Sequence, residues 1–153
     1  MAKERGPCVF CEVVAGRAPA NVVWENGLAI AIMDIAPMRP GHVLVVNRRH
    51  TAAVEGLTAP ERDNLLRVGD AIGRAQRSLG AHGVNFAIND GRAAHQTVPH
   101  VHLHVLPRRR GDVPALIWQV LCKPVRLLLP SSRTRLQAQA ARIAAAMPLA
   151  ASD

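Results

Sequence analysis

Residues 100–106 read His100-Val101-His102-Leu103-His104-Val105-Leu106. Histidine and aliphatic residues alternate with a period of two, which is typical of a β-strand with one apolar face turned into a core. All three imidazoles are then expected on the other face, with neighbours roughly 6–7 Å apart. At that spacing two or three of them can act on one phosphate or one metal ion. A strand that carries three outward-facing histidines only as surface residues is the weaker interpretation.

This pattern resembles the histidine triad (HIT) family of nucleotide hydrolases and transferases. The resemblance covers about residues 7–110, including a segment similar to the family's N-terminal helix (8–20) and one similar to its central hairpin (33–50). It implies an α+β fold, the HIT fold, with a five-stranded antiparallel sheet, a long helix and a short N-terminal helix. Residues 1–110 would form the core. Residues 111–153 would be a C-terminal helical extension packed on that core or on a dimer partner, within one domain overall.

The composition indicates one globular domain. The chain has 153 residues, of which 49% are hydrophobic and 20% charged, enough to bury a core. It shows no signal-peptide pattern and no apolar run long enough to cross a membrane, which favours a cytoplasmic protein without a membrane partner. The net charge of +8 favours anionic partners. Two Trp, two Phe and no Tyr offer little stacking for single-stranded bases, which argues against a dedicated nucleic-acid binder.

Turn and strand signals outline the sheet before the triad. Asn26-Gly27 is a strong hairpin signal between strands expected at 22–25 and 28–33. Further strands are expected at 42–46 and 83–89, and the triad strand follows as the fifth. The first three should form an antiparallel meander. Strands interrupted by one long helix suggest an α+β layer with the helices gathered on one face.

Helix signals flank these strands. Residues 8–15 are expected to form a short helix that ends at Gly16. Thr58 and Glu61 form a capping box that opens the longest helix, whose apolar residues recur at spacings of three and four up to Gly80. Beyond residue 110 the pattern weakens: 113–129 is helix or extended chain. Ser131 or Ser132 could cap a last helix, with one apolar side formed by Leu136, Ala140, Ile143 and Met147.

The resemblance assigns the catalytic residues. Imidazole is a suitable nucleophile near neutral pH, because it is largely uncharged there and also leaves easily. By position His102 would attack the α-phosphorus and form a nucleotidyl-histidine intermediate. His104 would hold a phosphate oxygen or the bridging atom. Thr97 stands where the family usually has a serine that contacts the leaving group, and its extra methyl restricts χ1.

The resemblance also implies a structural zinc ion. Cys8 and Cys11 form a Cys-x-x-Cys pair that places two thiolates within one helical turn. His50 and His100 match the ligands that many bacterial family members combine with such a pair, which would complete a tetrahedral site. Two reduced cysteines in a short helix are the alternative. Cys122 lies outside the pattern and is expected in the core.

Substrate-binding residues follow from the resemblance as well. Asp34 would accept hydrogen bonds from both ribose hydroxyls of a purine nucleotide. The apolar slot for the base would be formed by Val9, Phe10, Val13 and Ile35, although these are equally suitable as core residues. Asn89 and Gln96 would reach the phosphate and leaving group. Arg108-Arg109-Arg110 could attract polyphosphate or could simply be solvated, and His42 and His82 are interpreted as structural or exposed.

The function expected from these residues is hydrolysis or transfer at the α-phosphate of purine nucleoside 5′-monophosphate derivatives, such as phosphoramidates and acyl-adenylates, by a homodimer. Two alternatives stay open. One is a hydrolase of dinucleoside polyphosphates. The other belongs to a different class, a zinc-stabilised nucleotide-binding or interaction module without turnover.

Overall fold

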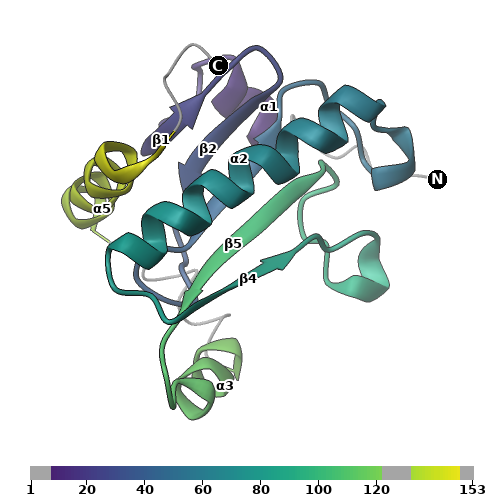
Figure 1. The fold of residues 1–153 in the computed structure, drawn as a ribbon. Helices are drawn as coiled ribbons and strands as arrows, with labels where there is room; N and C mark the ends of the chain where they lie inside the picture. Colours follow the sequence, from purple (N-terminus) through teal and green to yellow (C-terminus); the bar gives the residue numbers. More distant parts are fainter. Residues whose placement is uncertain (1–7, 122–131, 149–153) are drawn as a thin grey trace.

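The computed structural model describes residues 8–121 and 132–148, and its centre is a five-stranded antiparallel sheet in the order β1-β2-β3-β5-β4 (Figure 1). The strands are β1 (Val22–Glu25), β2 (Ala29–Met33), β3 (Val43–Asn47), β4 (Gly83–Ala87) and β5 (His102–Arg108). The first three form the expected meander. The triad strand β5 then enters between β3 and β4, which makes it an interior strand and leaves β1 and β4 at the edges.

The triad strand begins two residues later than the alternation suggested. His100 lies before β5, where the backbone N–H of Val101 donates to Thr51 O at 2.7 Å and Val101 O accepts from Asn47 N at 3.3 Å. The segment around His100 is therefore attached to the chain that follows β3. This attachment separates His100 from the row formed by His102 and His104.

The long helix α2 (Ala59–Ser78) covers one face of the sheet. Its capping box is present as expected, since Thr58 Oγ1 accepts from Glu61 N while the Glu61 carboxylate accepts from Thr58 N. Gly69 lets the helix approach β5 closely: a Cβ atom at this position would lie 2.6 Å from Leu103 Cδ2. The main core forms between α2 and this face, with Leu65, Val68, Ile72, Val45 and Leu103 at its centre.

The short helix α1 (Val9–Val14) lies on the opposite face, so the expectation that the helices gather on one face is wrong. Phe10 and Val13 pack there in a second cluster with Ile30, Ile32, Leu44 and Val46. Successive residues of β2 and β3 point to opposite faces and nearly all are buried, so both faces require a cover. The α1 helix covers the face on which the side chain of His102 lies, against Phe10.

The C-terminal part contributes two described helices. The helix α3 (Val113–Leu121) follows β5 and exposes Val113, Ile117 and Trp118. The helix α5 (Arg133–Ala146) follows Ser132 and buries Leu136, Ala140 and Ile143, as the spacing predicted, against the main core. Ser132 stands at the N-cap but its side chain makes no capping bond. Cys122 and Ser131 fall outside the described residues, and no helix within the described residues is long and apolar enough to span a membrane.

Candidate active site and metal centre

Four potential metal ligands converge where α1 meets the loops before β5 and after β3. Cys8 and Cys11 come from the start of α1, His50 from the end of β3 and His100 from the chain before β5, and their donor atoms all lie within 4.8 Å of one another. Cys11 Sγ is 3.3 Å from His50 Nδ1 and 3.7 Å from His100 Nδ1, while Cys8 Sγ is 3.5 Å from His100 Nδ1. Two thiolates and two imidazoles are the donor set that tetrahedral Zn²⁺ prefers.

The surroundings of His100 favour metal binding through its Nδ1 atom. Its Nε2 lies 2.6 Å from Asn47 O, and since a carbonyl oxygen only accepts, Nε2 carries the hydrogen and Nδ1 keeps its lone pair toward the thiols. Burial lowers the pKa of His100, which is completely buried, and so favours the neutral ligand form. Burial, together with the neighbouring Cys8, raises the pKa of the Cys11 thiol. Metal binding at this site must therefore release a proton from a thiol.

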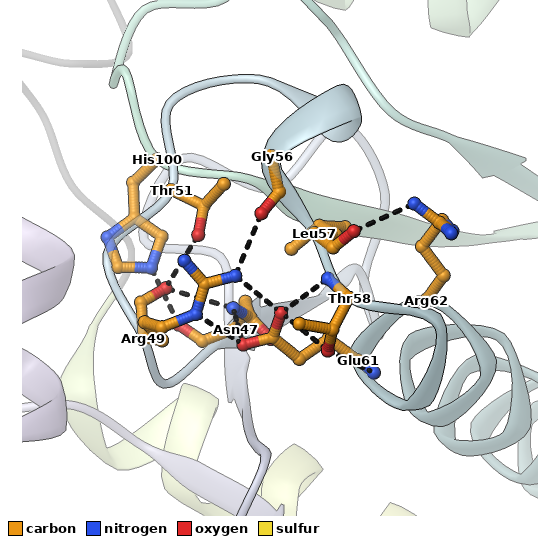
Figure 2. A network of polar contacts seen from close by, with 9 residues as sticks. All are labelled: Asn47, Arg49, Thr51, Gly56, Leu57, Thr58, Glu61, Arg62 and His100. Carbon is orange, nitrogen blue, oxygen red and sulfur yellow. Dashed lines mark hydrogen bonds and ion pairs between the residues drawn. The ribbon is translucent and has the colours of Figure 1, made fainter.

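A buried carboxylate fixes the segment that carries Asn47 and Arg49 (Figure 2). Glu61, at the start of α2, receives two hydrogen bonds from Arg49, at 2.8 and 2.6 Å, and one from Asn47 Nδ2 at 3.2 Å. These donors and the N-terminus of α2 hold the pKa of Glu61 far below its usual range, with the Arg49 hydrogen bonds the main cause. The network joins the first turn of α2 to the end of β3, and thereby positions His50 and the carbonyl of Asn47.

His102 is held in one tautomer and one orientation. Its Nδ1 lies 2.7 Å from His100 O, so Nδ1 donates its hydrogen and Nε2 keeps a lone pair. The ring is 5% exposed and packs edge-on against Phe10, with ring centroids 4.9 Å apart, and against His104 at 4.8 Å. This contact and these packed rings fix the orientation of the imidazole.

His104 contacts His42, and His42 contacts Asp34. No pattern in the sequence predicted this chain of contacts. His104 Nδ1 is 3.1 Å from Nε2 of His42, which is 1% exposed, and His42 Nδ1 is 3.2 Å from Asp34 Oδ2. A carboxylate only accepts, so it favours hydrogen on His42 Nδ1, and His42 Nε2 then accepts from His104 Nδ1. Met38 N also approaches His42 Nδ1 at 3.3 Å. The contact between His42 Nδ1 and the Asp34 carboxylate is charge-assisted and is therefore the stronger of the two.

Several known proteins are similar to this chain in sequence. The HIT domain family model matches residues 15–111. This chain belongs to the HIT family. An uncharacterised HIT-like protein of Mycobacterium tuberculosis is 49% identical over 107 residues, covering 69% of this chain and 74% of the relative. Adenosine 5′-monophosphoramidase of Schizosaccharomyces pombe is 35% identical over 101 residues, covering 66% of this chain and 74% of the relative.

A solved relative has the same fold. The crystal structure of a Zn-bound histidine triad family protein from Mycobacterium smegmatis superimposes with a TM-score of 0.75 at 38% identity, and the match covers 91% of each chain. The expected fold, an α+β domain with a five-stranded antiparallel sheet, a long helix, a short N-terminal helix and C-terminal helices, is confirmed by the model and by this likeness.

Gln96 holds the loop before the triad in place. Both ends of this side chain hold the loop, since Nε2 donates to Ala52 O at 2.7 Å and Oε1 accepts from Gly91 N at 3.0 Å. Thr97 and His95 are exposed, and His95 adopts a left-handed backbone conformation with φ of 62°. Asn89 follows β4 and is half-buried. In this HIT domain Gln96 thus stabilises the loop that carries Thr97.

The residues expected to bind the base divide into two groups. Val9 and Ile35 are exposed, at 49% and 58%, whereas Phe10 and Val13 are buried in the cluster between α1 and the sheet. Asp34 is half-buried, and its Oδ1 accepts from Ala36 N at 2.9 Å. The exposed pair offers apolar contact to a ligand, while Phe10 of the buried pair packs against the ring of His102.

Proposed function

We propose that this HIT protein is a nucleotide hydrolase or transferase that acts at the α-phosphate of purine nucleoside 5′-monophosphate derivatives, with phosphoramidates and acyl-adenylates as substrates. The observation that carries the proposal is the contact between His102 Nδ1 and His100 O, which leaves Nε2 of His102 as a fixed nucleophile. The phosphoramidase among the relatives supports the choice of substrate class.

The first step forms a bond between His102 Nε2 and the α-phosphorus while the bond to the leaving group breaks. The leaving amine of a phosphoramidate takes up one proton from solvent as it departs, and the water that attacks in the second step releases one proton to solvent. The hydrogen bond from His102 Nδ1 to His100 O stabilises the positive charge that the ring acquires. Thr97, which is exposed, is the proposed donor to the leaving group.

In the second step water adds to phosphorus and the bond to Nε2 breaks, so that AMP leaves and His102 regains its lone pair. In its protonated form His104 donates a hydrogen bond to the phosphate oxygens through Nε2. Its Nδ1 is held by His42, which in turn is oriented by Asp34. Stabilisation of developing charge by such fixed donors is commonly the largest catalytic contribution.

The nucleoside is proposed to lie across Asp34 and Ile35. A carboxylate has about four acceptor positions, and the contacts of Asp34 to Ala36 and His42 leave room for the ribose hydroxyls. Ile35 and Val9 would contact the base, with Phe10 beneath His102. Asn89 would reach the phosphate, and Gln96 would contribute by holding the loop.

A structural zinc ion is proposed at Cys8, Cys11, His50 and His100. The donor set and the orientation of His100 fit this ion, and the Zn-bound relative supports the assignment. Zinc there would join α1 to the segment before β5. Because His100 O accepts from His102, a fixed His100 also fixes the nucleophile.

We further propose a homodimer in which two sheets join at β4. This strand is an edge of the sheet, and its residues Asn85, Phe86 and Ala87 are exposed. An exposed edge strand with an apolar residue is a template for pairing with a second strand. Residues 1–110 form the HIT core in this proposal, and residues 111–153 extend it.

The deciding experiment compares AMP release from adenosine phosphoramidate and from a diadenosine polyphosphate. Faster turnover of the phosphoramidate supports the proposal, and the reverse order supports the dinucleoside polyphosphate alternative. His102→Ala should lower kcat by about three orders of magnitude or more while AMP binding is retained, because the nucleophile is lost but the nucleoside contacts remain. Binding of AMP without turnover of either substrate by the unmodified chain would favour the binding module instead.

A further inference from the structure

A cavity of about 410 Å³ lies on the face of the sheet that carries α2 and α5, away from the triad. Its polar lining comes from four parts of the chain: Arg39 and Gly41 before β3, Gln76 near the end of α2, Arg109 after β5, and Gln139 and Arg142 of α5. The volume lies within the range of about 300–1,000 Å³ that is typical of small-molecule sites. The residues that line it do not include the histidines of the triad or the metal ligands.

The charge of this cavity is strongly positive. Three arginines line it and no acidic residue does. Asp112 is the nearest carboxylate to Arg39, at 3.9 Å, but it is already paired with Arg108 at 2.6 Å. Arg109 and Arg142 make no side-chain hydrogen bond or ion pair within the described residues. Arg39 therefore has only a long ion pair to a carboxylate that is shared with Arg108, and Arg109 and Arg142 have none among the described residues. Guanidinium groups in this state are suited to bind an anion.

Two amide side chains shape the polar floor around Gly41. Gln139 Oε1 accepts from Gly41 N at 2.8 Å, and Gln76 Nε2 donates to Gly41 O at 2.9 Å and to Val105 O at 3.2 Å. Gln76 is 3% exposed, and its Oε1 has no donor among the described residues. Buried acceptors are nearly always paired with a donor or an ordered water. A hydroxylated ligand or a water molecule in the cavity would supply that donor.

The cavity is built on α5, whose spacing presents its polar residues on the same side. Gln139 and Arg142 are three residues apart, and Ile143, which also lines the cavity, is buried in the main core. The core contact fixes the helix, and the helix then aims the arginine at the cavity. Arg133 and Arg135, on the first turn of the same helix, are exposed and do not line the cavity.

We infer that this cavity is a second binding site, separate from the triad, for a small molecule that carries a phosphoryl group. Arg39, Arg109 and Arg142 bind the phosphoryl oxygens, and the amides of Gln76 and Gln139 contact its polar substituents. The site does not depend on the proposed hydrolysis. It also assigns a role to Arg109 within the basic run that follows β5.

The test titrates inorganic pyrophosphate into the isotope-labelled full chain and follows backbone amide signals by NMR. Signals of residues 79–81 and 139–143, at the cavity, should shift with saturation. The double variant R109Q/R142Q should raise the Kd from these signals at least about tenfold, because two charge-assisted contacts are lost. Both arginines are exposed, so the fold should be retained, and the unchanged remainder of the spectrum checks this. The single variant R142Q should give a smaller increase.

The matched control is R133Q/R135Q, which removes the same total charge, here from α5, the helix that carries Arg142, and should leave the Kd within about twofold. The inference is overturned if the cavity signals do not move up to about 10 mM pyrophosphate. It is equally overturned if the control weakens binding as much as R109Q/R142Q, because the attraction would then come from net charge alone. Shifts confined to residues near His102 would assign pyrophosphate to the triad and would also reject the second site.

Discussion

His102 and His104 differ in the groups behind them, although they occupy equivalent positions of one strand. His102 Nδ1 donates to the backbone carbonyl of His100, which fixes the tautomer in which Nε2 carries the lone pair. Behind His104 are His42 and the carboxylate of Asp34. A carbonyl fixes a hydrogen without offering charge, whereas a carboxylate at the end of a chain of imidazoles stabilises positive charge. This difference supports the different roles proposed for the two histidines, attack for His102 and charge stabilisation for His104.

His42→Ala should lower kcat by about 100-fold with little change in KM, since His42 positions His104 without touching the nucleoside. The pH profile of kcat should also change shape, which loss of packing alone would not cause. Steady-state kinetics on adenosine phosphoramidate measure both quantities. His82→Ala, at an exposed histidine outside the site, is the control and should behave as wild type. An unaltered kcat in His42→Ala would show that His104 needs no support from His42.

At the scale of the element, the first turn of α2 does more than cap a helix. Glu61 closes the capping box with Thr58 and also receives Arg49 and Asn47 from the end of β3. One carboxylate thus accepts a hydrogen bond from the backbone at the helix N-terminus and also fixes the segment that carries His50. Because the carboxylate is 6% exposed, its charge depends on these donors and not on water.

Glu61→Gln should lower the free energy of unfolding by about 2 kcal/mol, since the charge-assisted bonds to Arg49 become weaker neutral ones. The half-exposed Arg49 is screened by solvent, which keeps the loss moderate. Urea unfolding at neutral pH measures this difference. Glu55→Gln, at an exposed glutamate nearby, is the matched control and should change stability by less than about 0.5 kcal/mol.

Glu61 should also make stability depend on pH. Its pKa in the folded chain lies well below the ordinary value of 4.5. The stabilisation is therefore complete above about pH 4.5 and is lost as the pH falls toward the folded-state pKa. Thermal unfolding of wild type between pH 7 and 3 should show a steeper loss than Glu61→Gln. Parallel curves for the two proteins would contradict this role.

At the scale of the whole molecule, both faces of the sheet are used. The face under α2 and α5 forms the main core, and the face under α1 carries the triad and the potential metal ligands. The α1 helix has only six residues and cannot be stable alone. It is held by Phe10 and Val13 and by its cysteines, so we expect metal binding to contribute strongly to its position.

Removal of zinc by a chelator should lower the melting temperature by roughly 10 °C, because binding to the folded state alone stabilises it. Calorimetry of the protein before and after chelation measures the change. Cys11→Ser should show the lower melting temperature without chelator and little further change with it. Zinc affinity should also fall as the pH is lowered, since the thiols must lose their protons. A chelator-independent melting temperature in wild type would reject a structural zinc ion.

Phe86→Lys should convert the proposed dimer to a monomer, because it places a charge on the exposed edge strand β4. Light scattering coupled to size-exclusion chromatography measures the mass. Val22→Lys on β1 is the control, since it changes an edge residue of the opposite side with the same exposure of 43%. A dimer that survives Phe86→Lys, or one that Val22→Lys dissociates, would place the interface elsewhere.

Local patterns determined the elements of this protein. The alternating histidines predicted the triad strand, and Thr58 and Glu61 predicted the start of α2. The spacing of Leu136, Ala140 and Ile143 predicted the buried side of α5. The Cys-x-x-Cys pair with His50 and His100 was recognised through family resemblance, and the structure brings the four together. Each of these signals lies within a few residues or follows a known motif.

Only the tertiary structure decided which elements meet. His42 and His104 are 62 residues apart, and no periodicity relates them, yet strand pairing places their rings at hydrogen-bond distance. Likewise, Arg39, Arg109 and Arg142 come from three separate segments and line one cavity. The tertiary structure also decided the position of α1, which packs on the face of the sheet that α2 does not cover. Local sequence specifies backbone conformation through short-range sterics and hydrogen bonds, whereas contacts between distant side chains depend on how all buried faces pack at once.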